Sequence, residues 1–206
     1  MSGFERHLVV MARRPALGTG KRRLAADIGA LAAQRFYRDT TAALLRRLTP
    51  DPRWRSWLAV TPDAAADRDR LPWYYEGTTI AQGRGDLGAR MGRLLRDLPP
   101  GPVVIVGSDI PDIAGHHIRS AFRALGRHDW VFGPAEDGGY WLVGARRRPR
   151  LTAAFEGVRW SSATTLADSL ANLDGQPIAF LECLADIDRG RDLAAWRAAR
   201  RGVVSR

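Results

Sequence analysis

Short apolar runs, separated by polar and glycine-containing stretches, recur along the whole chain. Branched and aromatic side chains dominate several stretches of strand length, namely 8–12, 56–60, 103–106, 129–134, 140–144 and 177–181. A strand covered on both faces has such a continuous apolar run, whereas a strand with one solvated face alternates between apolar and polar residues. The pattern therefore predicts a mostly parallel sheet that is buried between layers of helices.

Apolar residues at helical spacing occupy the stretches between these runs. Leu31, Phe36 and Leu44 lie largely on one face of a helix predicted over residues 30–48, and Pro50 ends it because proline cannot continue a helix. The same spacing predicts shorter helices over 87–98 and 165–173, and another that has His116 and His117 in its first turn and ends near Gly126. Strands that alternate with helices indicate an α/β protein with helices on both faces of a central sheet.

Length and composition place limits on this fold. With 206 residues, 45% of them hydrophobic, the chain can bury a full core, and we expect a single domain over residues 1–206. No stretch is long and apolar enough for a membrane span, and the charged start does not resemble a signal peptide, so we expect a cytoplasmic protein. Cys183 is the only cysteine, and we expect it to be a small core residue rather than a nucleophile.

The net charge of +10 could indicate a nucleic-acid partner, because such proteins neutralise phosphates. The arginines, however, are spread along the chain, and the one dense cluster, at 146–150, has no interleaved aromatics. We therefore expect no nucleic-acid partner and a surface that attracts small polyanions. Lys21 is the only lysine among the 32 Lys and Arg residues. A lysine retained in such a chain suggests a position that requires a compact ammonium.

Two parts of the chain supply aspartates that could bind a metal ion. Asp109 ends the apolar run 103–106, and ligands of parallel sheets collect at the carboxyl ends of strands. Asp186 and Asp188 are spaced so that both can leave an extended segment on the same side. Together these residues offer the hard oxygen ligands that Mg²⁺ requires beside phosphates. Asp109 could instead cap a turn, and Asp188 could be the N-cap of the final helix.

The loop after the first predicted strand is rich in glycine and cations. Residues 13–24 include Gly18 and Lys21, which suits a bound phosphate chain. The segment is not a P-loop, because Pro15 stands where a glycine is required and Arg22 replaces the hydroxyl residue that would bind magnesium. A solvated basic loop is the alternative.

Two further segments have more than one interpretation. Gly83, Gly85 and Gly88 match the spacing G-x-G-x-x-G of dinucleotide-binding proteins, which leaves a dinucleotide-binding oxidoreductase as an alternative function. The preceding predicted strand is short and polar, however. Asp137-Gly138 could border a ligand or form a plain hairpin turn.

Adjacent histidines lie in the first turn of the helix predicted before residue 125. Because His116 and His117 are neighbours in the sequence, we expect that they do not share a helix face as metal ligands would.

Several segments together carry a resemblance to a known family. The chain resembles a bacterial family of unknown function described as glycosyltransferase-A-like, within the nucleotide-diphospho-sugar transferase superfamily and similar to phospholactate and molybdenum-cofactor guanylyltransferases. The matching segments are 12–15 with Gly18 and 21–24, then 82–91, 107–111, 133–140, and 186–188 with 192–193. The Gly-Pro-Ala-x-Asp-Gly-Gly-Tyr segment at 133–140 is the most specific of them. The resemblance implies a Rossmann-like three-layer sandwich of the glycosyltransferase-A type.

The resemblance also implies roles for individual residues. Asp109 and Asp188 would bind Mg²⁺ or Mn²⁺, and Lys21, Arg23 and Asp109 would form the catalytic group. Residues on the nucleotide side would be Ala12, Arg13, Gly18, Lys21, Gln82, Gly83, Gly85, Asp86 and Ser108. Residues on the acceptor or sugar side would be Pro111, Glu136, Asp137, Gly138 and Gly139.

The implied activity is a metal-dependent transfer from a nucleoside triphosphate or nucleotide-sugar to an acceptor. The metal would neutralise phosphates while Lys21 and Arg23 stabilise the leaving group. Arg22 replaces the family's usual Thr, Gly20 a larger residue, and residues 189–191 the usual Thr-Pro-Glu. These departures leave a non-catalytic nucleotide-binding protein as a further alternative. Nucleotidylyl and glycosyl transfer, the base, the acceptor and the oligomeric state stay open.

Without a metal, two carboxylates that share one site should repel each other. On this premise, Asp109→Asn and Asp188→Asn are each expected to leave the metal-free protein at least as stable as the parent.

Overall fold

The computed structural model describes residues 5–67, 71–147, 151 and 153–204. Its strands are β1 (His7–Arg13), β2 (Arg55–Thr61), β3 (Thr78–Ala81), β4 (Val103–Gly107), β5 (Trp130–Pro134), β6 (Tyr140–Ala145) and β7 (Ile178–Phe180). Its helices are α1 (Arg22–Ile28), α2 (Ala30–Leu48), α3 (Leu87–Asp97), α4 (Gly115–Ala124), α5 (Thr165–Ala171) and α6 (Gly190–Val204), with a short 3₁₀ helix at Asp63–Ala66. Strands and helices alternate along most of the chain, as the sequence predicts.

The described strands form one seven-stranded sheet in the order β3-β2-β1-β4-β6-β5-β7. β1 lies near the centre and pairs in parallel with β2 and β4, while β6 runs antiparallel to its two neighbours. The segment that contains Asp137-Gly138 joins β5 to β6, so it is a hairpin connection. The chain moves outward from β1 through β2 to β3, and then crosses to β4 on the other side of β1. This reversal leaves a crevice at the carboxyl ends of β1 and β4.

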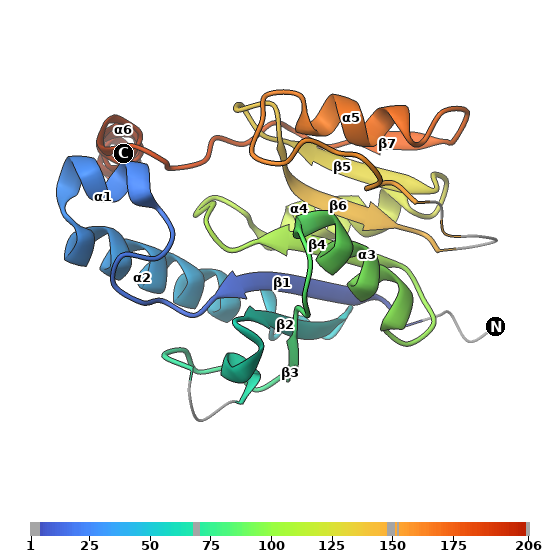
Figure 1. The fold of residues 1–206 in the computed structure, drawn as a ribbon, viewed down its shortest axis with the longest axis horizontal. Coiled ribbons are helices and arrows are strands. Elements are labelled where there is room, and N and C mark those ends of the chain that lie inside the picture. Colours follow the sequence, from blue (N-terminus) through green and yellow to red (C-terminus); the bar gives the residue numbers. More distant parts are fainter. Residues whose placement is uncertain (1–4, 68–70, 148–150, 152, 205–206) are drawn as a thin grey trace.

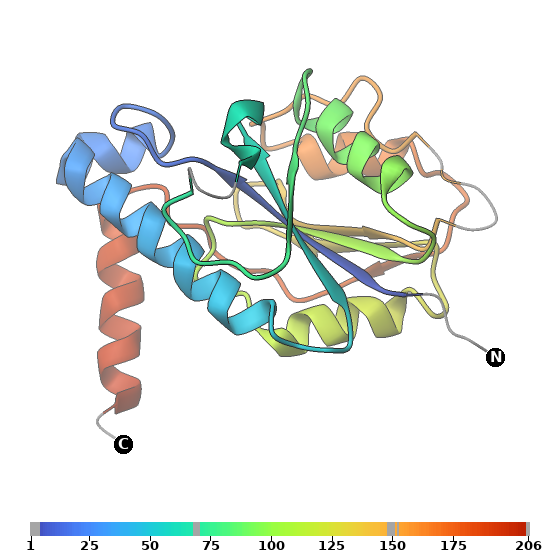
Figure 2. The same ribbon diagram turned by 90° about the horizontal axis from the view of Figure 1, so that it is seen from below.

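Helices cover both faces of the sheet and complete a three-layer sandwich (Figures 1 and 2). On one face, Leu44 and Leu48 of α2 and Phe122 of α4 pack against apolar residues of the strands. On the other face, Met91 and Leu95 of α3 join a second core, to which α5 contributes partly buried leucines. Each inner strand therefore has apolar side chains on both sides, which accounts for the continuous runs in the sequence. The predicted fold class is confirmed.

A smaller third cluster holds α1 and α6 at the carboxyl-end side of the sheet, at the left of Figure 1. Leu24 of α1, Ala33 of α2 and Ile187 and Leu193 of the last segment form its buried centre. The helix α1 was not expected, because its sequence reads as part of a basic loop. Its single fully buried residue, Leu24, gives too little apolar periodicity to predict a helix.

Two further observations concern the surface. Cys183 is exposed, so its predicted core position is wrong; it lies just beyond β7, the short strand at one edge of the sheet. Within the described ranges, no helix combines the length and the apolar character needed to cross a membrane.

A fully buried histidine at the start of β1 makes stability depend on pH. Trp57 Nε1 donates a hydrogen bond to His7 Nδ1 at 3.2 Å, and burial lowers the pKa of His7 below its ordinary value of 6.5. The unfolded chain therefore binds more protons than the folded protein below that pH, and stability must fall as pH decreases.

We predict that the free energy of unfolding, measured with urea between pH 7.5 and pH 5, falls as the pH drops through 6.5. In His7→Gln, whose amide oxygen can still accept from Trp57, the decrease should be smaller. Some decrease will remain, because burial also lowers the pKa of His117. Identical pH slopes in the parent and the variant would contradict this account.

Candidate functional site

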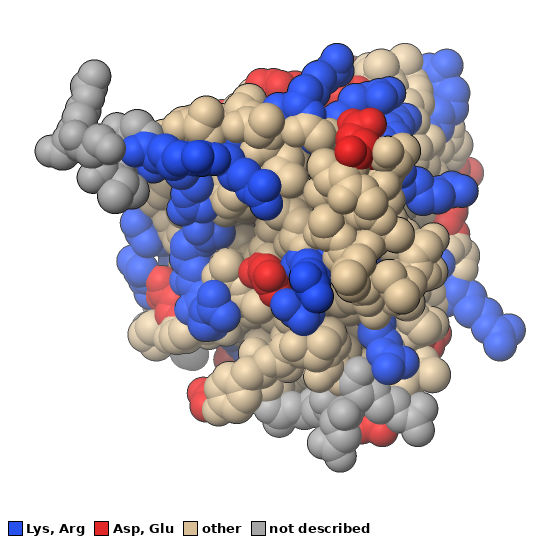
Figure 3. Space-filling model, turned by 90° about the vertical axis from the view of Figure 1, so that its left-hand side faces the viewer, with Lys and Arg blue, Asp and Glu red and all other residues tan. Residues whose placement is uncertain are grey.

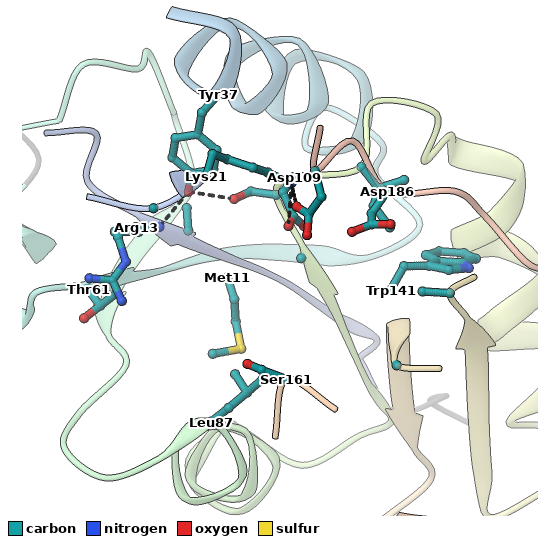
Figure 4. A pocket seen from close by; sticks show the side chains of 18 of the residues that line it. Met11, Arg13, Lys21, Tyr37, Thr61, Leu87, Asp109, Trp141, Ser161 and Asp186 are labelled. Carbon is teal, nitrogen blue, oxygen red and sulfur yellow. Dashed lines mark hydrogen bonds and ion pairs between the residues drawn. The ribbon is translucent and has the colours of Figure 1, made fainter. Parts of the chain in front are cut away.

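A cavity of about 530 Å³ lies at the carboxyl ends of β1 and β4. Figure 4 shows Lys21, Asp109 and Asp186 on one side of it, with Met11, Leu87 and Ser161 opposite them. The cavity is lined by ten of the residues predicted for the site, namely Ala12, Arg13, Gly18, Lys21, Gln82, Ser108, Asp109, Asp137, Gly139 and Asp188. Segments that are far apart in the sequence therefore meet at the predicted edge of the sheet.

Lys21 occupies the point where the two predicted metal ligands converge. Its Nζ lies 3.2 Å from Asp109 Oδ2 and 2.8 Å from Asp188 Oδ1, and the lysine side chain is only 8% exposed. Arg23 Nη1 lies 3.6 Å from the other oxygen of Asp188, from a more exposed position. One ammonium thus joins a carboxylate at the end of β4 to a carboxylate that precedes α6.

The backbone of the basic loop directs this lysine inward. Lys21 has φ 41° and ψ 40°, a left-handed conformation that is uncommon outside glycine, and it immediately precedes α1. Gly20, the residue before it, also has a positive φ. Two successive residues with positive φ turn the chain sharply, and the side chain of Lys21 is buried against Asp109 and Asp188 while that of Arg23 stays exposed.

The alternative role of Asp188 as a helix cap is not observed. The N–H groups of Arg189 and Gly190, where α6 begins, donate to carboxylates of Asp192 and Asp27 respectively. The carboxylate of Asp188 is therefore left to interact with Lys21 and Arg23.

The charges of the site influence one another strongly. Burial opposes the charge on Lys21, but the carboxylates of Asp109 and Asp188 outweigh it and hold the pKa of the ammonium above 10.5. Burial would likewise raise the pKa of Asp188, but Lys21 and Arg23 hold it below its ordinary value. Burial, followed by the charges of Asp188 and Asp137, raises the pKa of Asp186 to about 6. The group therefore has more negative charge than Lys21 alone can neutralise.

This donor set fits a divalent metal ion. Asp109 and Asp188 already direct carboxylate oxygens at one cation, and Asp186 adds a third carboxylate that is partly buried. Hard oxygen ligands of this kind suit Mg²⁺ or Mn²⁺. A metal ion bound by both carboxylates would compete with the ammonium of Lys21 for the same position.

Gln82 has a structural role that the sequence did not indicate. Its side chain is buried, and its Nε2 donates to the carbonyl oxygens of Ala12 and Ala59, at 3.1 and 2.9 Å. Both amide hydrogens are therefore used to join the ends of β1 and β2. Only Oε1 remains available, and Arg90 Nη1 lies 3.5 Å from it.

The glycine-rich segment after β3 shapes the start of α3. Gly83 donates its N–H to Asp63, and Asp86 caps α3 by accepting the N–H of Ala89. Gly85 has φ 102°, and a Cβ at Gly88 would lie 2.6 Å from the ring of Trp160. Gly83, Gly85 and Asp86 are predicted nucleotide-binding residues, but they do not line the cavity.

Several residues predicted for the acceptor side also serve local structure. Gly138 has φ 86°, and a Cβ there would lie 2.2 Å from the carbonyl oxygen of Ala163, so this glycine permits close packing of two chain segments. The carbonyl of Pro111 accepts from Arg47 at 2.7 Å. Glu136 is exposed, and of this group only Asp137 and Gly139 line the cavity.

The expectation for the adjacent histidines is wrong. Nε2 of His117 and Nε2 of His116 approach the same oxygen of Glu182, at 2.8 and 3.6 Å, because the two side chains bend towards each other. His117 Nδ1, however, accepts the N–H of Ala114, which places the proton on Nε2. A histidine that binds a metal normally donates from its other nitrogen, so we assign no metal to this cluster.

Tyr37 is a site residue that was not predicted. It lines the cavity from α2, a helix for which the sequence indicated no site residue. Ser161, which also lines the cavity, was not predicted either, and it has a left-handed backbone with φ 56°. No motif in the sequence marks either residue as part of the site. Figure 3 shows that basic side chains are spread over the face at the left of Figure 1, with fewer acidic ones between them.

This sheet order, with a cavity at the ends of β1 and β4, defines an α/β protein of the glycosyltransferase-A type. A protein from Desulfovibrio desulfuricans G20, provisionally named a nucleotide-diphospho-sugar transferase, is 27% identical with a TM-score of 0.82; the match covers 91% of this chain and 84% of that one. The chain belongs to a family described as uncharacterized proteins conserved in bacteria (DUF2064), whose model matches residues 44–162. No curated protein matches the chain significantly in sequence.

More distant structures share the fold. The 4-diphosphocytidyl-2C-methyl-D-erythritol synthase of Anaerococcus prevotii has a TM-score of 0.62 at 12% identity, over 96% of this chain and 98% of that one. Glucosyl-3-phosphoglycerate synthase of Mycobacterium tuberculosis, solved with Mn²⁺, UDP and glucosyl-3-phosphoglycerate, has a TM-score of 0.55 at 12% identity, over 94% of this chain and 76% of that one. The fold therefore occurs in two synthases, of which the second was solved with Mn²⁺ and a nucleoside diphosphate.

Removal of the shared ammonium provides a test of the site's electrostatics. Lys21→Met keeps an unbranched stem but leaves Asp109 and Asp188 without their common partner. Because both carboxylates are at least a third exposed, water screens their repulsion, and we expect a loss of about 1 kcal/mol in the free energy of unfolding at pH 7.

This loss should shrink as the pH is lowered from 7 to 4, because protonated carboxylates no longer repel. Urea unfolding at several pH values measures it. A deficit that is independent of pH would indicate a packing defect instead.

Proposed function

We propose that the protein is a metal-dependent transferase that acts on a nucleoside triphosphate or a nucleotide-sugar. The observation that carries this proposal is the convergence of Asp109 and Asp188 on one buried cation, at the mouth of a cavity between β1 and β4. Ligands of open α/β sheets bind at this position, and carboxylates beside a basic loop suit a metal–phosphate group.

Asp109 and Asp188 would hold Mg²⁺ or Mn²⁺, with Asp186 beside them. When bound, the metal neutralises phosphate oxygens and polarises the phosphoryl or glycosyl bond. Lys21 and Arg23 would then bind the phosphates and stabilise the charge on the leaving group. Both side chains already lie at Asp188, so a small movement could transfer them from a carboxylate to a phosphate.

We assign the other predicted residues that line the cavity to two sides of it. Ala12, Arg13 and Gly18 belong to β1 and the basic loop, and we assign them to the nucleotide. Asp137 and Gly139 lie on the β5–β6 connection, and we assign them to the acceptor or sugar. Gly83, Gly85 and Asp86 would act indirectly, because they fix the start of α3.

The same geometry argues against the dinucleotide-binding alternative. Gly83, Gly85 and Gly88 follow β3, which is an edge strand, whereas the dinucleotide fingerprint follows the first strand, at the centre of the sheet. The N-terminus of α3 is also capped by Asp86, which places a carboxylate where a pyrophosphate would bind.

Ligand-dependent thermal stability tests the proposal. The protein is heated with each nucleoside triphosphate and with a panel of nucleotide-sugars, with and without Mg²⁺. Because binding stabilises the native state by mass action, we expect stabilisation that requires the nucleotide and the metal together. Release of pyrophosphate or of a nucleoside diphosphate with an acceptor then distinguishes nucleotidylyl from glycosyl transfer. Stabilisation by dinucleotides without metal would contradict the proposal.

Substitution of the two metal ligands gives a sharper prediction. Asp109→Asn and Asp188→Asn should each weaken Mg²⁺-dependent nucleotide binding by at least about tenfold, because each removes one carboxylate of the pair. Asp97→Asn, an exposed position at the end of α3, is the matched control and should bind normally.

Repulsion between the two carboxylates alone would make both Asn variants at least as stable as the parent, but the structure leads us to expect a different result. Lys21 already offsets the two charges, so the Asn variants should be slightly less stable than the parent without ligand, not more stable. Isothermal titration and urea unfolding measure the two effects. Normal nucleotide binding in Asp188→Asn would exclude a shared ion.

A further inference from the structure

The strand β1 extends beyond its neighbour β4. In the parallel register the last residue of β4, Gly107, lies opposite Met11, so Arg13 has no partner in β4. The hydroxyl of Tyr37, from α2, accepts the N–H of Arg13 at 2.8 Å and lies 2.9 Å from Ser108 Oγ. One side chain therefore joins the ends of the two strands that border the cavity, as Figure 4 shows for Tyr37 and Arg13.

The Tyr37 hydroxyl accepts from Arg13 and has one proton to donate. Of these two partners only Ser108 Oγ can accept that proton, because the N–H of Arg13 is a donor. Burial raises the pKa of Tyr37, which keeps this hydroxyl protonated. When the Tyr37 hydroxyl donates to it, Ser108 accepts with its oxygen and keeps its own proton for another partner. Ser108 is buried and lines the cavity beside Asp109.

Neighbouring contacts hold Tyr37 in this position. One helical turn further along α2, Thr41 Oγ1 lies 2.9 Å from the carbonyl oxygen of Tyr37 and 3.4 Å from that of Ser108. The ring of Tyr37 also makes an edge-on contact with Trp73, with ring centres 6.4 Å apart. The hydroxyl is thus held by a helix that itself packs on the sheet.

We propose that Tyr37 is a positioning residue: it fixes the separation of the β1 and β4 ends and directs the hydroxyl proton of Ser108 into the cavity, for donation to a phosphate oxygen of the ligand. The phosphate part of this proposal rests on the proposed function. The joining of the two strand ends does not.

A double-mutant cycle on nucleotide affinity tests the proposal. Tyr37→Phe, Ser108→Ala and the double variant are compared by titration with Mg²⁺ and each of ATP, GTP, CTP and UTP. Each single variant should weaken the best-bound nucleotide about tenfold. The double variant should also lose only about tenfold, because the two hydroxyls act as one unit; the coupling is then about 1.4 kcal/mol.

Ser169→Ala is the matched control, because it removes another buried serine hydroxyl that faces a tyrosine, Tyr140 at 3.4 Å, but belongs to α5 and does not line the cavity. It should bind nucleotide as the parent does. Unchanged affinity in Tyr37→Phe, or a loss of about a hundredfold in the double variant, would overturn the proposal, since packing alone gives independent effects.

Hydrogen exchange of the ligand-free protein separates this proposal from the proposed function. Peptides that contain Arg13 should exchange faster in Tyr37→Phe than in the parent, and not in Ser169→Ala. Unchanged exchange would overturn the proposal even if nucleotides bind. If exchange is faster in Tyr37→Phe but the parent binds no nucleotide, the proposed function is overturned and the junction between the strands stays in place.

Discussion

Two carboxylates and one ammonium, brought together from three distant parts of the chain, set the constraint on which the site depends. Lys21 is almost fully buried, and a buried ammonium is stable only when opposite charges surround it. Asp109 and Asp188 supply those charges, and in turn the lysine prevents their repulsion. The loop after β1, the end of β4 and the start of α6 must therefore keep fixed positions relative to one another.

The sheet and its helices meet this requirement with local devices. Glycines in the basic loop turn Lys21 inward, Gln82 and Tyr37 join the ends of neighbouring strands to β1, and the third apolar cluster holds α1 against α6. None of these contacts takes part in chemistry directly. Together they hold Lys21, Asp109 and Asp188 in a partly buried position, where charges interact more strongly than they do in water.

Much of this arrangement could be predicted from the sequence, for physical reasons that also explain the failures. Continuous apolar runs identified the buried strands, and Asp109 followed from the rule that ligands collect at strand ends. Lys21 was singled out because it is the only lysine. The helix α1 was missed because it buries only one residue fully, and the orientations of Tyr37, Gln82 and His117 depend on partners far away in the chain. Spacing along the sequence cannot reveal such contacts.

Because the chain has one lysine, the interaction of its ammonium with the two carboxylates can be measured directly. Nuclear magnetic resonance of protein labelled with ¹⁵N in lysine gives one side-chain Nζ signal, which reports on Lys21 alone. The account predicts a pKa above 10.5 for this ammonium, a lower value in Asp109→Asn and Asp188→Asn, and a change of the signal when Mg²⁺ and nucleotide displace it from the carboxylates. A signal that titrates at or below 10.5 in the parent and is unaffected by both substitutions would contradict the account.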